Sequence, residues 1–190
     1  MSRLLRHMPN LITSLRLAAA PATAALLAAG HFTAAFAVFV LAGLSDAADG
    51  FLAKRFNLSS PLGRVLDPAA DKALMLAAFV TLALLGAVPE WLAATVVARD
   101  VLILSGLAMA MALRAPLAVH PILLGKLSTA LQVLYIGWHL AGLAFDWPLG
   151  VLSPADAFAV GAATLLSGFG YVSVGLKAMR AVWLQDGRRA

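Results

Sequence analysis

Apolar residues fill most of this chain in long runs, and polar residues gather at the breaks between them. Each run approaches the length of about 20 residues that crosses the hydrocarbon core of a bilayer. The pattern predicts six membrane-spanning helices, at roughly 10–29, 33–55, 61–86, 90–113, 119–144 and 154–183. No internal repeat or linker divides them. We therefore expect an all-α polytopic protein in which residues 1–190 form a single membrane domain.

Turn-forming residues mark the joints between the runs. Gly30–His31, 86–89 and 146–148 punctuate three of them. At a fourth, Ser60 before Pro61 predicts a helix start, because a serine hydroxyl caps free backbone N–H groups and proline fits the first helical position. The basic N-terminus resembles a secretory signal, but polar residues interrupt the start of its apolar run. We expect this first segment to remain as a helix.

Composition narrows the class of protein. Apolar residues make up 62% of the chain and charged residues 12%, which excludes an ordinary soluble domain. There is no cysteine, so disulfides and thiolate metal sites are excluded. The net charge of +5 is attributed to basic cytoplasmic loops and not to a nucleic-acid partner.

The distribution of lysine and arginine predicts the orientation. With both termini in the cytoplasm, three of the expected loops face outward and contain no Lys or Arg. Only Arg16 and Arg99 then lie within spans and away from the cytoplasmic joints and termini, and cytoplasmic loops are known to carry the basic residues. We expect an integral protein of the bacterial inner membrane. The other basic residues lie at or near the cytoplasmic joints and termini: Arg3, Arg6, Lys54, Arg55, Arg64, Lys72, Arg114, Lys126, Lys177, Arg180, Arg188 and Arg189.

Four of the nine acidic residues form two pairs at helical spacing, Asp46 with Asp49 and Asp67 with Asp71. Residues three and four apart share a helix face, and a short turn between antiparallel helices would let the pairs face each other. Four converging carboxylates could not all stay ionised without cations between them. Hard oxygen ligands without His or Cys favour Mg²⁺, Mn²⁺ or Ca²⁺ over zinc. Two such ions form a clamp suited to phosphoryl transfer.

Small and basic residues adjoin the aspartates. Gly50 and Ala53 would let a phosphate-bearing ligand approach the backbone, and Lys54 and Arg55 follow them. Solvated carboxylates at a helix end are one alternative, and a divalent-cation transporter is another, since intramembrane carboxylates also mark ion pathways. Ion passage gives no reason for the neighbouring small and basic residues. The pattern therefore favours an enzyme site facing the cytoplasm.

This cluster resembles the signature of the CDP-alcohol phosphatidyltransferases, D-x2-D-G-x2-A-R-x8-G-x3-D-x3-D, with every interval kept. Lys54 stands where the family usually has arginine, which keeps the charge but loses the bidentate fork. That phosphate contact would be looser, or shared with Arg55. The resemblance extends through PNLITSLR, VVARDVLI and GKLSTALQ.

The resemblance implies a membrane enzyme, usually a homodimer, that moves a phosphatidyl group from CDP-diacylglycerol to an alcohol and releases CMP. It implies that Asp46, Asp49, Asp67 and Asp71 bind two divalent ions, Mg²⁺ or Mn²⁺, and that Asp71 is also the general base. A base must lie within hydrogen-bond reach of the proton it takes, here that of the attacking hydroxyl. The residues implied to bind CDP-diacylglycerol are Pro9, Asn10, Thr13, Gly50, Ala53, Lys54, Ser60 and Gly63.

Polar residues within the spans are candidates for the acceptor site, because ionisable residues inside membrane helices are costly and usually functional. Arg99, followed by Asp100, is either a neutralised structural pair or part of the acceptor pocket, and we favour the pocket. Lys126, Thr129 and Gln132 are spaced by three, which predicts one shared face. The expected acceptor-binding residues are Arg16, Arg99, Lys126, Thr129 and Gln132.

The identity of the acceptor is read from two local features. In phosphatidylglycerophosphate synthases, whose acceptor is glycerol-3-phosphate, the segment that corresponds to GKLSTALQ looks like G-K-x-K-T-x-x-Q. This chain has Ser128 in place of the second lysine. Asp100 follows Arg99 where those enzymes tend to show R-E. Both features, with LAGLSDAADGFLAKRF, look more like the CMP-forming cardiolipin synthases, whose acceptor is phosphatidylglycerol. We expect that acceptor, keep glycerol-3-phosphate as the main alternative, and leave other acceptors such as inositol phosphate or serine open.

Overall fold

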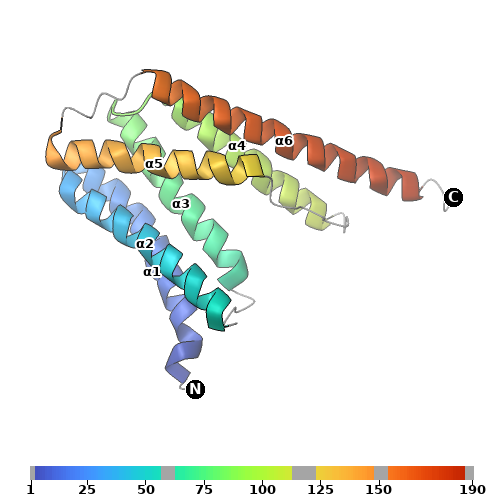
Figure 1. Ribbon diagram of the computed structural model, residues 1–190, viewed down its shortest axis with the longest axis horizontal. Helices are drawn as coiled ribbons and strands as arrows, with labels where there is room; N and C mark the ends of the chain where they lie inside the picture. Colours follow the sequence, from blue (N-terminus) through green and yellow to red (C-terminus); the bar gives the residue numbers. More distant parts are fainter. Residues whose placement is uncertain (1–2, 57–62, 113–122, 148–153, 187–190) are drawn as a thin grey trace. The chain divides into compact units, whose positions relative to one another are not determined.

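The computed structural model describes residues 3–56, 63–112, 123–147 and 154–186, with side chains placed for 14–45, 72–106, 108–109, 123–147 and 154–176. Its helices are α1 (Arg3–Ala28), α2 (Phe32–Phe56), α3 (Gly63–Leu84), α4 (Glu90–Ala112), α5 (Leu123–Phe145) and α6 (Pro154–Asp186) (Figure 1). No strand occurs in these ranges, so the all-α prediction is confirmed there. α1 begins at Arg3, ahead of the predicted start at residue 10, because the first apolar residues mark where a span begins and not where its helix begins.

Three predicted joints are closed by residues with a left-handed backbone. Gly30 has φ 76° and Gly86 has φ 71°, a conformation that glycine adopts without a steric penalty. After Gly30, the N–H of His31 and that of the glycine itself donate to carbonyls of the last turn of α1, as in a Schellman cap. Asp146 ends α5 with φ 51°. The joints at Gly30 and Gly86 are thus confirmed, and so is Asp146 of the third, whose Pro148 lies outside the described residues. The fourth joint, Ser60–Pro61, also lies outside them.

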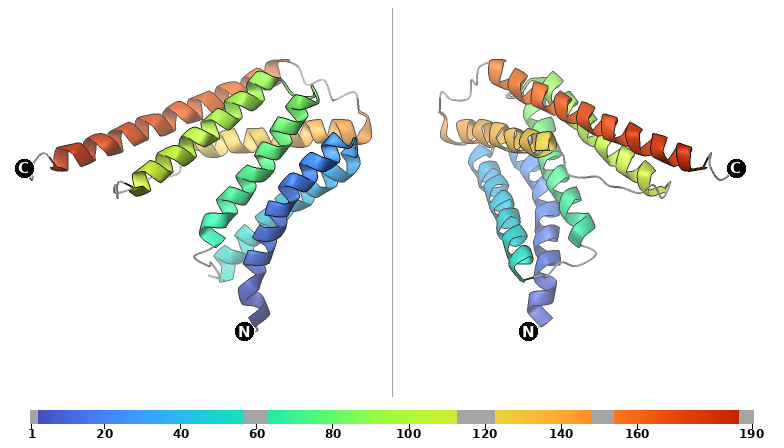
Figure 2. Two further views of the ribbon diagram at one scale, coloured as in Figure 1. Left: turned by 180° about the vertical axis from the view of Figure 1, so that it is seen from behind. Right: turned by 45° about the vertical axis from the view of Figure 1, so that its right-hand side comes forward.

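The described chain divides into two compact units, and unit 1 comprises Met1–Glu90 and Tyr135–Val151. α1 packs against both α2 and α3. α1 and α3 run in one direction and α2 runs in the opposite one, so the start of α1, the end of α2 and the start of α3 gather at one end of this unit (Figures 1 and 2). The apolar core includes Leu27, Phe79 and Ile136, all fully buried.

Unit 2 comprises Trp91–Leu134 and Leu152–Ala190. α4 and α6 lie side by side and run in the same direction (Figure 2). The Trp91 ring stacks on Phe158 with centroids 5.1 Å apart. Gly161 makes this contact possible, because a Cβ there would lie 2.7 Å from the Trp91 ring. Small residues at helix contacts allow such close approach in membrane proteins.

Among the residues whose side chains the structure places, two helices have the length and composition of membrane-spanning segments, at Leu123–Phe145 and Pro154–Leu176. Three shorter apolar stretches lie at Ser14–Ala28, Phe32–Ser45 and Lys72–Leu84. Large apolar side chains are exposed on all of α1 to α6, as lipid contact requires. The six-span topology with cytoplasmic termini stays a prediction.

Candidate active site

The four aspartates lie on two helix ends of unit 1. Asp46 and Asp49 belong to the last turns of α2, and Asp67 and Asp71 to the first turns of α3. These ends lie together with the start of α1 (Figures 1 and 2). Spacings of three and four place each pair along one side of its helix. The side chains lie outside the described part, so convergence of the carboxylates stays a prediction.

The residues predicted to bind CDP-diacylglycerol lie at this same end of unit 1. Apart from Ser60, which is outside the described residues, all belong to α1, α2 or α3 near the helix ends just named. The four aspartates offer only oxygen ligands, a donor set that fits Mg²⁺ or Mn²⁺. Among the side chains that the structure places, which do not include these four, no group of three or more His, Cys, Asp or Glu could hold a metal. The CDP-binding residues are Pro9, Asn10, Thr13, Gly50, Ala53, Lys54 and Gly63.

Arg16 is the predicted acceptor residue that lies in unit 1. It sits on α1 and is buried, with 3% of its surface exposed. It lies less than a turn beyond Thr13 of the predicted donor pocket. Arg16 is thus a buried cation on the helix that carries donor-pocket residues, and its acceptor role stays a prediction.

Arg99 is the centre of a polar cluster within unit 2. Its Nη1 donates to Asp100 Oδ1 at 2.7 Å, and the two side chains are 5% and 15% exposed. Its Nη2 donates to Ser167 Oγ of α6 at 2.8 Å. The guanidinium carbon lies 5.7 Å from the centroid of the Tyr171 ring, within cation–π range. The structure therefore shows the neutralised pair and its contacts to α6, and a role for Arg99 in the acceptor pocket stays a prediction.

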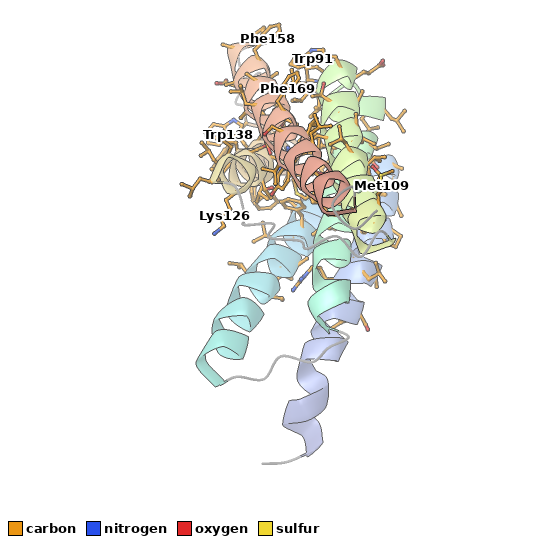
Figure 3. The ribbon with its side chains drawn as sticks, turned by 90° about the vertical axis from the view of Figure 1, so that its right-hand side faces the viewer. Trp91, Met109, Lys126, Trp138, Phe158 and Phe169 are labelled. Carbon is orange, nitrogen blue, oxygen red and sulfur yellow. The ribbon has the colours of Figure 1, made fainter. Side chains whose placement is uncertain are left out.

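The residues spaced by three on α5 do not share one face. Lys126 is exposed and projects outward from α5 (Figure 3), whereas Gln132 is fully buried against α6. Thr129 donates to the Gly125 carbonyl of its own helix at 3.1 Å. Each step of three falls short of a full turn by about 60°, so two steps rotate a side chain about 120° around the helix. Their joint role at an acceptor stays a prediction.

Ser128 belongs to the buried contact between α5 and α6. The Gln132 amide donates to Ser128 Oγ at 3.3 Å and to Thr164 Oγ1 at 2.9 Å, and the Ser128 hydroxyl lies 3.4 Å from Thr164 Oγ1. A lysine at position 128 would bring a charge into this contact, where burial is costly. Serine at this position therefore has a packing reason besides any link to the acceptor.

Sequence reasoning missed the polar residues of α6. Thr164, Ser167 and Tyr171 all contact side chains of α4 or α5. They are spaced by three and four, which places them on one helix face. That spacing is visible in the sequence, but a Ser or Thr hydroxyl can bond to a carbonyl of its own helix, as Thr164 does to Val160, so it does not by itself indicate a contact with another helix. The face they form is the polar side of α6 in unit 2.

Comparison with known proteins identifies relatives of this chain. The profile of the CDP-alcohol phosphatidyltransferases matches residues 6–176, which span both units. A fusion protein from Schizosaccharomyces pombe, named cardiolipin synthase (CMP-forming) / mitochondrial hydrolase, is 33% identical over 86% of this chain and 30% of its own. A putative cardiolipin synthase from Mycobacterium tuberculosis is 34% identical over 78% of this chain and 66% of its own.

A relative with a different name matches comparably well. A probable phosphatidylglycerophosphate synthase from Mycobacterium tuberculosis is 31% identical over 90% of this chain and 82% of its own. This chain therefore spans less than a third of the fission-yeast protein and most of the mycobacterial one. Overall similarity alone does not separate the two acceptors.

Proposed function

Because the chain belongs to the CDP-alcohol phosphatidyltransferase family, we propose that it is a CMP-forming cardiolipin synthase. Family membership makes the chain a transferase of phospholipid synthesis and not an ion transporter. The proposed donor is CDP-diacylglycerol and the proposed acceptor is phosphatidylglycerol. Two of the relatives described above carry cardiolipin synthase in their names, which favours this acceptor.

The observation that carries the choice of acceptor is the part-buried ion pair of Arg99 and Asp100, 2.7 Å apart. Asp100 neutralises the cation of α4 that the sequence offers to an acceptor. A neutral pair suits the singly charged phosphodiester of phosphatidylglycerol better than the dianionic phosphate of glycerol-3-phosphate, which needs several cations. Arg16, Lys126, Thr129 and Gln132 complete the proposed acceptor residues.

The proposed transfer needs no reactant besides the donor and the acceptor. A hydroxyl oxygen of phosphatidylglycerol forms a bond to the lipid-side phosphorus of the CDP-diacylglycerol pyrophosphate. The bond from that phosphorus to the bridging oxygen breaks, and CMP leaves with this oxygen. The Asp71 carboxylate takes the proton of the attacking hydroxyl and passes it to solvent. Pro9, Asn10, Thr13, Gly50, Ala53, Lys54, Ser60 and Gly63 are proposed to hold the donor.

Enzymes of this family use divalent metal ions. We assign Asp46, Asp49, Asp67 and Asp71 as the ligands of two ions, Mg²⁺ or Mn²⁺, because carboxylates provide hard oxygen atoms and no hydrogen-bond donors. Such ions, when bound, neutralise charge on the attacking and leaving oxygens. The chain's own part is to place four acceptors at the ends of α2 and α3.

The proposed setting is a bacterial inner membrane with six spans, cytoplasmic termini, an active site on the cytoplasmic side and a homodimeric assembly. Helix directions within each unit support alternating spans. α2 runs opposite to α1 and α3 (Figure 1), and α4 runs parallel to α6 (Figure 2). Consecutive spans must cross in opposite directions, whereas alternate spans cross in the same one. Residues 1–190 are proposed to act as one catalytic domain, because the family match spans both units.

Phosphatidylglycerophosphate synthase is the second candidate, favoured by the relative of that name whose own length is 82% covered. The deciding experiment measures CMP release by purified protein from CDP-diacylglycerol and Mg²⁺ or Mn²⁺, with phosphatidylglycerol or glycerol-3-phosphate in separate reactions. We expect CMP and cardiolipin only with phosphatidylglycerol. Turnover only with glycerol-3-phosphate would establish the second candidate, and no CMP with either would refute both.

A further inference from the structure

The guanidinium of Arg99 has hydrogen-bonding capacity that its protein partners leave unused. An arginine carries five N–H donors. Asp100 and Ser167 each accept from one of its terminal nitrogens. The Nε atom is buried, and none of the described residues accepts a hydrogen bond from it. A buried donor without an acceptor is costly, so an external oxygen at this position would be favourable.

Two side chains of α6 fix the direction in which this guanidinium points. Ser167 accepts from Nη2 at 2.8 Å, and the ring of Tyr171 lies 5.7 Å from the guanidinium carbon. The aliphatic part of Arg99 lies over Gly168, where a Cβ would be 3.7 Å from Cγ. Contacts to Nη2, to the face of the guanidinium and to the aliphatic Cγ restrict the rotation of the Arg99 side chain.

Tyr171 is itself held from α5. A Cβ added to Gly125 would lie 2.8 Å from the Tyr171 hydroxyl oxygen and 3.0 Å from the Cε2 atom of its ring. Any larger residue at position 125 would therefore displace the ring that supports Arg99. Gly125 is the first residue of the GKLSTALQ segment, so that segment is linked to Arg99 through Tyr171.

We propose that Ser167 and Tyr171 are positioning residues, which hold the Arg99 guanidinium so that its Nε–H donates to a phosphodiester oxygen of the acceptor lipid. This proposal rests on the proposed function, since it concerns the acceptor of that reaction. Asp100 supplies the compensating charge, so the site takes a singly charged phosphate group. Gly125 sets the place of Tyr171.

The test replaces the ring and measures each substrate separately. Tyr171→Leu removes the aromatic face, Tyr171→Phe keeps it, and Phe169→Leu is the matched control, because the Phe169 side chain of α6 is exposed. We expect Tyr171→Leu to raise the KM for phosphatidylglycerol by about two- to thirtyfold, the range that loss of a cation–π contact allows. The KM for CDP-diacylglycerol should stay near the wild-type value in Tyr171→Leu. Both KM values should stay near wild type in Tyr171→Phe and in Phe169→Leu.

A second variant tests the link to α5 without removing the ring. Gly125→Ala should raise the KM for phosphatidylglycerol, and adding Tyr171→Phe should restore part of the loss, because the hydroxyl is the atom nearest the new methyl group. This arm decides the matter if Tyr171→Leu fails to fold.

The outcomes separate the two proposals. An unchanged acceptor KM in Tyr171→Leu or Gly125→Ala, or an equal rise for both substrates together with a lower Tm, would overturn the positioning role. A wild-type protein that makes no cardiolipin would overturn the proposed function, and this result is visible before any variant is made.

Discussion

Gln132→Leu is a sharp test of how α5 and α6 are joined. The Gln132 side chain is 1% exposed and donates to Thr164 Oγ1 at 2.9 Å and to Ser128 Oγ at 3.3 Å. Leucine keeps much of the volume of glutamine. The substitution therefore removes hydrogen bonds without opening a large cavity, and the loss of stability reports mainly on those bonds.

The expected magnitude is modest. Hydrogen bonds between membrane helices contribute about 0.6 kcal/mol on average and up to about 1.7 kcal/mol. The Thr164 hydroxyl still donates to the Val160 carbonyl at 2.8 Å, so the substitution leaves no donor on Thr164 without an acceptor. We expect Gln132→Leu to lower the free energy of unfolding by about 0.5–1.5 kcal/mol. For a chain of this length, the Tm in detergent should fall by about 1–6 °C.

A double-mutant cycle isolates the contact. Thermal unfolding is measured for wild type, Gln132→Leu, Thr164→Val and the double variant, and the coupling should be about 0.6–1.7 kcal/mol. Thr129→Val is the matched control, because Thr129 donates to a carbonyl of its own helix. Additivity within about 0.3 kcal/mol would refute the α5–α6 contact. A raised KM for phosphatidylglycerol with unchanged stability would instead assign Gln132 to the acceptor.

Three further predictions concern packing, catalysis and selectivity. Gly161→Ala should lower the free energy of unfolding by about 1–3 kcal/mol, because the new Cβ would lie 2.7 Å from the Trp91 ring. Gly175→Ala on the same helix is the control, because no atom lies within 4 Å of a Cβ there, and equal Tm values for the two variants would contradict the prediction. Asp71→Asn should reduce CMP release by about 10²–10⁴-fold with CDP-diacylglycerol binding retained; normal turnover would remove Asp71 as the base. Asp100→Asn should raise kcat/KM for glycerol-3-phosphate relative to phosphatidylglycerol by about tenfold, and an unchanged ratio would contradict charge-based selection.

Helix positions were predictable because the signals that set them are local. Apolar runs located all of the helices from α1 to α6, and Gly30, Gly86 and Asp146 were found at the ends of α1, α3 and α5. A left-handed cap depends on a few neighbouring residues, and the sequence displays them directly. The start of α1 was less well placed, since polar residues continue that helix beyond its apolar part.

Contacts between helices were less predictable because they depend on how two faces meet. The sequence marks Arg99 and Asp100 as a pair, but it does not reveal that Ser167 and Tyr171 lie opposite them. Equal spacing along α5 suggested a common face, yet the helical rotation leaves Lys126 exposed and Gln132 buried. Spacing along one helix fixes neighbours on that helix only, whereas partners on another depend on packing.

Hydrogen-bonding capacity separates two kinds of polar cluster on apolar helices. Ser128, Gln132 and Thr164 carry donors and acceptors, and they satisfy one another across α5 and α6. Ionised aspartates are acceptors only, so the pairs on α2 and α3 cannot satisfy each other and require cations or donors from elsewhere. A cluster whose members cannot satisfy one another's hydrogen bonds indicates a ligand. A cluster whose members can do so is explained by packing alone. Arg99 lies between these cases, because its partners account for some of its donors and leave Nε for a bound oxygen.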